Sequence, residues 1–136
     1  MRIETLKAEQ LLKVFRKYAI SAAYLFGSAA NGNERKDSDI DVAILLPADL
    51  SKKMRFEIRL ALMHDLARVL DKNVDVVILN DIISLFFKYV IIKEGVLLYE
   101  KNESERIDFE NRILSSYFDF QPFLNLYNRQ YVKNNL

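Results

Sequence analysis

Two aspartates, Asp39 and Asp41, stand on either side of one isoleucine at the start of an apolar run. In an extended chain successive side chains point to opposite faces, so both carboxylates are expected on the same face of a strand. Carboxylates held that close repel each other unless a cation compensates their charge. Magnesium typically binds one or two carboxylates together with the oxygens of a phosphate substrate. The pair therefore indicates half of a metal–nucleotide site.

Gly27 and Ser28 end the preceding apolar run, and ten residues separate Ser28 from Asp39. Glycine permits a sharp turn and a close approach of the backbone to a ligand, and backbone N–H groups with a hydroxyl can bind phosphate. We therefore expect Gly27 and Ser28 to face a triphosphate beside the two carboxylates. The alternative is an ordinary loop followed by an exposed edge strand that begins with acidic residues.

The elements that position these residues follow from the apolar periodicity. We expect helices near 4–18, 51–70, 81–94 and from 103 onward, and strands over 22–26, 40–46, 74–79 and 96–99. Pro122 is expected to kink or break the last helix, whose aromatic residues either cover the sheet or contact a partner. The second helix is expected to bury a stripe made of Phe56, Leu60, Met63, Ala67 and Leu70.

Asp75 interrupts the otherwise apolar strand 74–79. An ionised carboxylate is rarely buried alone, so Asp75 needs a ligand, a basic partner or an exposed position. His64 is the only histidine, and because its helix face is otherwise charged we interpret it as a solvated surface residue.

The bulk composition excludes several classes of protein. The chain has 136 residues, 20 of them basic and 19 acidic, which is typical of one globular domain without the positive excess of a nucleic-acid binder. No cysteine is present, so disulfides and thiolate metal sites are excluded. No apolar leader or membrane span is visible, which indicates a cytoplasmic protein with no membrane partner.

The Gly-Ser pair followed after ten residues by Asp-Ile-Asp resembles the signature of the DNA polymerase β-like nucleotidyltransferases, and the short chain resembles their minimal (MNT) members. The resemblance implies an α+β fold with a small mixed sheet, helices packed mainly on one face and a C-terminal helical tail. It implies a single nucleotidyltransferase domain over 1–136, with a core of about 1–100 and a helical extension of about 103–136. It also implies that Asp39, Asp41 and Asp75 bind two Mg²⁺ ions and that Gly27 and Ser28 hold the β- and γ-phosphates of ATP.

Residues 106–112 and 117–119 make the tail similar to that of the antitoxins of HEPN/MNT toxin–antitoxin pairs. This similarity implies a protein adenylyltransferase that uses Mg-ATP to attach AMP to a tyrosine of a HEPN-family ribonuclease toxin. Two alternatives stay open: an antitoxin that acts by binding alone, and a nucleotidyltransferase that modifies a small molecule such as an aminoglycoside. Many members carry arginine where this chain has Asn31, and Arg35 or Lys36 are the other basic residues available to contact phosphate.

Overall fold

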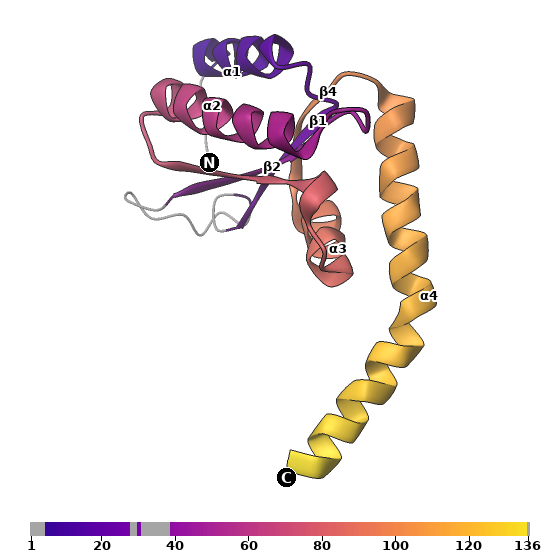
Figure 1. Cartoon of the computed structure of the whole chain (residues 1–136). Coiled ribbons are helices and arrows are strands. Elements are labelled where there is room, and N and C mark those ends of the chain that lie inside the picture. The colour runs from indigo at the N-terminus through magenta and orange to yellow at the C-terminus, as the bar shows by residue number, and fades with distance from the viewer. Residues whose placement is uncertain (1–4, 28–29, 31–38, 136) are drawn as a thin grey trace.

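A four-stranded sheet with strand order β3-β2-β1-β4 forms the centre of the molecule (Figure 1). The structure is a computed structural model, and it describes residues 5–27, 30 and 39–135, with side chains for 8–27, 30 and 39–122. In chain order the elements are α1 (Thr5–Lys17), β1 (Ala22–Phe26), β2 (Ile40–Leu45), α2 (Lys52–Leu70), β3 (Val74–Ile78), the 3-10 helix η2 (Leu79–Asp81), α3 (Leu85–Glu94), β4 (Val96–Glu100) and α4 (Glu103–Asn135).

Strand pairing determines which side chains share a face. β1 runs antiparallel to β2 and β4, whereas β2 and β3 are parallel. Asp41 lies opposite Phe26 of β1 and beside Asp75 of β3. Because side chains alternate along each strand, Asp41 and Asp75 point to the same face of the sheet.

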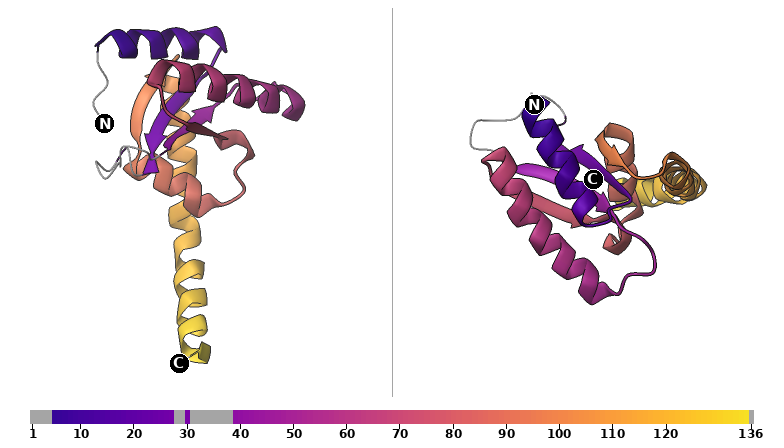
Figure 2. Two further views of the ribbon diagram at one scale, coloured as in Figure 1. Left: turned by 90° about the vertical axis from the view of Figure 1, so that its left-hand side faces the viewer. Right: turned by 90° about the horizontal axis from the view of Figure 1, so that it is seen from above.

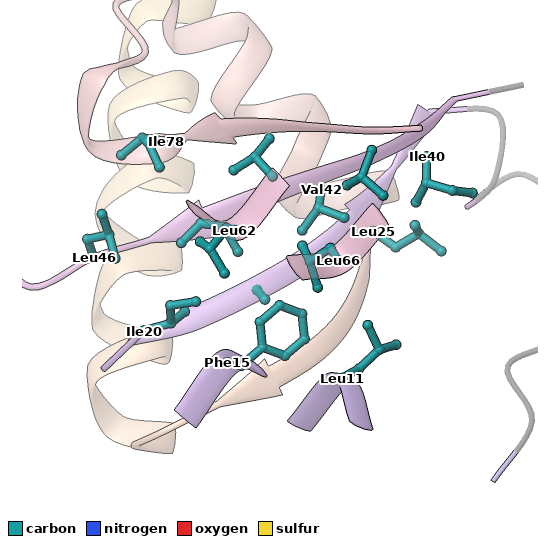
Figure 3. Close-up of a cluster of buried hydrophobic side chains, with 14 residues drawn as sticks. Leu11, Phe15, Ile20, Leu25, Ile40, Val42, Leu46, Leu62, Leu66 and Ile78 are labelled. Carbon is teal, nitrogen blue, oxygen red and sulfur yellow. The ribbon is translucent and has the colours of Figure 1, made fainter. Parts of the chain in front are cut away.

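One face of the sheet is covered by α1 and α2, which lie side by side over it (Figure 2). Phe15 of α1 and Leu62 and Leu66 of α2 are buried against the strands (Figure 3). The predicted stripe on α2 was wrong in part, since Phe56 is 55% exposed and Leu60 48% exposed. Apolar residues occur on several sides of α2, so periodicity alone did not identify the buried side.

The opposite face is covered in part by α3 and α4. Ile91 of α3 and Phe109 and Ile113 of α4 pack against Tyr24 and Ala43 of the strands. The α+β class, the mixed sheet and the C-terminal helix are confirmed. The expectation that helices pack mainly on one face needs correction, because helices pack on both faces of the sheet. After Asp41 the strand side chains are apolar on both faces, so the second face must also be buried against helices.

Helix α3 begins later than predicted. Residues 79–81 form η2, and Ser84 caps α3 by accepting a hydrogen bond from the Phe87 N–H at 3.1 Å. The side chain of Asn80 instead pairs with the N–H and C=O of Leu46, at 3.0 and 2.8 Å. Asn80 therefore joins the end of β2 to η2.

Helix α4 is attached to the sheet by a partly buried polar network. The Tyr24 hydroxyl donates to Glu110 at 2.9 Å, and Arg106 donates to Glu110 at 2.8 Å and also binds Glu100. The network joins β1, β4 and α4, so it fixes the first turns of α4 against the sheet.

Tyr24→Phe is expected to lower the free energy of unfolding by about 1 kcal/mol, because it removes one partly buried hydrogen bond. Burial, and then the hydrogen bond to Glu110, raise the pKa of the Tyr24 hydroxyl above its usual value. The folded state therefore holds this proton more tightly than the unfolded chain, and stability is lost as the pH rises above about 10. Urea unfolding at about pH 8 and about pH 11 should show a smaller alkaline loss in the variant. Equal losses in both proteins would contradict this assignment.

Helix α4 is 33 residues long and continues through Pro122. It is therefore not broken at the proline, although it changes direction along its course (Figure 1). Its first part packs on α3, and its C-terminal part extends beyond all other elements (Figures 1 and 2). Within the ranges that the structure describes, no helix is both long and apolar enough to cross a membrane.

Candidate active site

The end of β1 lies directly against the first carboxylate of β2. Gly27 has a φ of +76°, and a Cβ atom added to it would lie 2.5 Å from Oδ2 of Asp41. Both the left-handed backbone and the contact with the carboxylate require glycine at this position. The predicted proximity of Gly27 and Asp41 is therefore present in the fold.

Three carboxylates gather at the same end of the sheet. Asp39 precedes β2, Asp41 lies within it, and Asp75 occupies the paired position on β3. Partial burial, then the charges of Asp75 and Asp39, raise the pKa of Asp41 above its usual value. Asp39 and Asp75 are thus close enough to oppose ionisation of Asp41. A bound cation would relieve this repulsion between the carboxylates.

The carboxylates line a cleft of about 490 Å³. Its walls come from β2, β3 and α2: Asp39, Asp41, Met63, His64, Ala67, Asn73, Val74 and Asp75. His64 is exposed, as expected, but it also borders the cleft. The positions of His64 and Asn73 beside the carboxylates could not be predicted from the sequence, because they depend on how α2 and the start of β3 lie against β2.

Asp75 has a basic neighbour. The Arg59 guanidinium lies 3.6 Å from its carboxylate, and the Asp75 side chain remains 51% exposed. Arg59 also donates to the main-chain oxygen of Val76 at 2.6 Å. The salt bridge that the sequence left open as an alternative for Asp75 is therefore present, at the open edge of β3 and beside the cleft.

The donor set fits a magnesium–nucleotide complex better than a metal ion held by protein alone. No group of three or more Asp, Glu or His side chains within the described ranges is arranged to hold a metal ion as it stands. Mg²⁺ commonly takes one or two carboxylates and completes its shell with phosphate oxygens and water. Asp39 and Asp41 supply carboxylates of that kind beside the Gly27 turn.

Part of the predicted site lies outside the described residues. This applies to Ser28, the proposed phosphate ligand, and to Asn31, Arg35 and Lys36. The role of Ser28 stays a prediction.

The family model for "Polymerase beta, Nucleotidyltransferase" matches residues 9–104, from α1 to the start of α4. The chain belongs to this nucleotidyltransferase family. The resemblance indicated by the Gly-Ser and Asp-Ile-Asp spacing is confirmed. Gly27, which follows β1, and the strands that carry Asp41 and Asp75 all lie inside the matched range.

Individual relatives of this nucleotidyltransferase are similar over nearly the whole chain. Protein adenylyltransferase MntA of Shewanella oneidensis is 28% identical over 121 residues, which are 88% of this chain and 83% of that protein. A chain in the crystal structure of a toxin–antitoxin with AMP-PNP has a TM-score of 0.73 and 26% identity, covering 92% of this chain and 98% of that one.

A chain in the structure of tri-AMPylated Shewanella oneidensis HEPN toxin with MNT antitoxin has a TM-score of 0.68 at 23% identity. The match covers 96% of this chain and 99% of that one, and at this identity it concerns the fold. Because these matches exceed the 9–104 range, α4 belongs to the shared fold rather than being an addition to it.

Proposed function

We propose that this chain is the antitoxin of a toxin–antitoxin pair and that it transfers AMP from ATP to a tyrosine of a HEPN-family toxin. In this proposal residues 1–136 act as one catalytic domain in the cytoplasm, where ATP is available. The observation that carries the proposal is the gathering of Asp39, Asp41 and Asp75 around one cleft beside the Gly27 turn, in a member of the nucleotidyltransferase family. Similarity to a protein adenylyltransferase and to a toxin–antitoxin chain crystallised with AMP-PNP supports a protein acceptor and ATP.

The proposed reaction is an in-line displacement at the α-phosphorus. The acceptor oxygen forms a bond to this phosphorus, the bond to the β-phosphate oxygen breaks, and pyrophosphate leaves with that electron pair. Asp39 and Asp41 would hold two Mg²⁺ ions together with Asp75. Bound magnesium supplies charge neutralisation on the phosphates and lowers the pKa of the attacking hydroxyl.

The chain's own residues position the phosphates of ATP and accept the proton of the attacking hydroxyl. The Gly27 backbone lies against Asp41, so phosphates bound at this turn would be held next to the carboxylates. Asp75 is half-exposed at the edge of the sheet, where an incoming hydroxyl can reach it, and would accept the proton of that hydroxyl. The hydroxyl of Ser28 would donate a hydrogen bond to an oxygen of the β- or γ-phosphate.

Arg59→Gln is expected to increase Mn²⁺ binding in the presence of ATP by up to about fivefold, because the guanidinium competes for the carboxylate of Asp75. The gain is small since the pair is half-exposed and screened by solvent. Free Mn²⁺ measured by electron paramagnetic resonance tests this independently of turnover. Arg68→Gln, an exposed arginine of the same helix, is the matched control. Weaker Mn²⁺ binding in Arg59→Gln would instead assign the guanidinium to the nucleotide phosphates.

Incubation with α-labelled ATP, Mg²⁺ and the HEPN-family toxin of the same pair tests the proposal. We expect label on the toxin, retained on a tyrosine-containing peptide, together with loss of its ribonuclease activity. Loss of ribonuclease activity without label would favour the antitoxin that acts by binding. Label on an added aminoglycoside but not on the toxin would favour the small-molecule transferase.

A further inference from the structure

An exposed aromatic surface is built from α3 and α4. It consists of Phe86 and Tyr89 of α3 and Tyr117 and Phe118 of α4. Tyr89 and Tyr117 stack with centroids 3.8 Å apart and planes at 7°, and Phe86 and Phe118 flank them at 6.3 and 6.2 Å. Phe86 is nevertheless 58% exposed and Phe118 56% exposed. Stacked rings with exposed aromatic flanks are typical of the centre of a protein interface.

The aromatic surface is linked to the carboxylates through one intervening pair of rings. Phe87, next to Phe86 on α3, packs edge-to-face on Phe26 at 5.8 Å. Phe26 is the strand partner of Asp41 and directly precedes Gly27. The layer formed by α3 and α4 covers the face of the sheet toward which Asp41 and Asp75 point. A protein seated on the aromatic surface would therefore lie beside the carboxylates.

Helix α4 needs a further contact of its own. Its C-terminal part extends beyond the other elements (Figures 1 and 2). An isolated helical segment of this length is marginal in water, because helix stability in proteins comes mainly from packing. The toxin–antitoxin chain that matches 92% of this chain shares at least a large part of α4, so a helix of this kind occurs in a protein that belongs to a toxin–antitoxin pair.

We infer that the aromatic surface, continued along α4, is where the HEPN-family toxin docks, and that docking there delivers the acceptor tyrosine to the cleft. This inference rests on the proposed function for the identity of the partner. It assigns substrate recognition to α3 and α4 and leaves ATP binding to the turn and carboxylates of β1, β2 and β3. Selection of the acceptor and binding of the nucleotide are thus carried by different residues.

The test compares two double variants that change exposed apolar side chains on opposite sides of the sheet. Phe86→Ser/Phe118→Ser changes the aromatic surface, and Met54→Ser/Phe56→Ser changes α2, where the two side chains are 47% and 55% exposed. Toxin affinity is measured by surface plasmon resonance, and ATP binding by titration calorimetry with Mg-ATP. We expect the first variant to lose at least tenfold in toxin affinity and in label transfer, with ATP binding within twofold of wild type. The α2 control should stay within twofold in both measurements.

Ile83→Glu provides a second variant in which folding is not at issue. Ile83 is 97% exposed and lies three residues before Phe86, just ahead of the Ser84 cap of α3, so glutamate there should weaken toxin binding without loss of thermal stability. Toxin affinity within twofold of wild type in both surface variants would overturn the inference. A second result would also overturn it: the wild-type protein forms a dimer, Phe86→Ser/Phe118→Ser dissociates that dimer, and toxin affinity is unchanged. The aromatic surface would then bind a second copy of this chain. Wild-type binding of the toxin without any label would contradict the proposed adenylylation but leave the docking surface intact.

Discussion

Asp41→Asn should reduce AMP transfer by about 10³-fold while the metal-free protein becomes more stable. Loss of a carboxylate that neutralises the metal–phosphate complex costs several kcal/mol in the transition state, and each 1.36 kcal/mol is a factor of ten in rate. The opposite effect on stability follows from electrostatics. Burial and the charges of Asp75 and Asp39 raise the pKa of Asp41, so its ionised form opposes folding.

The sign of the pH dependence distinguishes this explanation from a general loss of structure. Because the folded protein binds the Asp41 proton more tightly than the unfolded chain, stability without metal falls as the pH rises through the range above about 3.8. Asparagine carries no charge, so the variant should lack this part of the decrease and melt at a higher temperature near pH 7. Thermal melts in a chelator at several pH values provide the measurement. Asp49→Asn, at an exposed turn, is the control and should match wild type in both assays. A lower melting temperature for Asp41→Asn would refute the electrostatic argument.

Gly27→Ala is expected to reduce AMP transfer by about 10²-fold, because a displacement of about 1 Å at the reacting groups can cost that much. Alanine at a φ of +76° costs about 1–2 kcal/mol, and its Cβ would meet the Asp41 carboxylate at 2.5 Å. Either the turn or the carboxylate must move, and both belong to the proposed site.

A double-mutant cycle separates the two contributions to this cost. Asp41→Ala removes the carboxylate that the new methyl group would meet, so Gly27→Ala in that background should retain only the backbone cost. Urea unfolding of the four proteins gives the coupling. A cost of Gly27→Ala that is the same in both backgrounds would show that the contact with Asp41 is not what requires glycine.

The carboxylate pair and the strands were predictable from the sequence because alternation and length specify them locally. Asp39 and Asp41 share a face for the same reason that Ile40 and Val42 share the other, and the predicted strand bounds agree with the structure to within one residue. The partnership of Asp41 with Asp75 needed the family resemblance, since parallel pairing of β2 and β3 is a long-range feature.

The features that could not be predicted from the sequence depend on contacts between elements that are far apart in the chain. The Arg59–Asp75 pair arises because α2 reaches the open edge of β3, and the helix periodicity contains no information on that crossing. The periodicity also does not show that His64 borders the cleft or that α3 and α4 pack on the second face of the sheet. The burial of Leu62 and Leu66 instead of Phe56 was missed because α2 carries apolar residues around most of its circumference.

The most direct test of the central claim is the position of a metal ion when ATP is present. Crystals grown with Mn²⁺ and a non-hydrolysable ATP analogue would locate the ion by its anomalous scattering. We expect Mn²⁺ bound by carboxylate oxygens of Asp39 and Asp41 at about 2.1 Å, with phosphate oxygens completing the shell and the Asp75 carboxylate turned from Arg59 toward the ion. Mn²⁺ and nucleotide bound elsewhere, with Asp75 still paired to Arg59 and no ligand on Asp41, would contradict it.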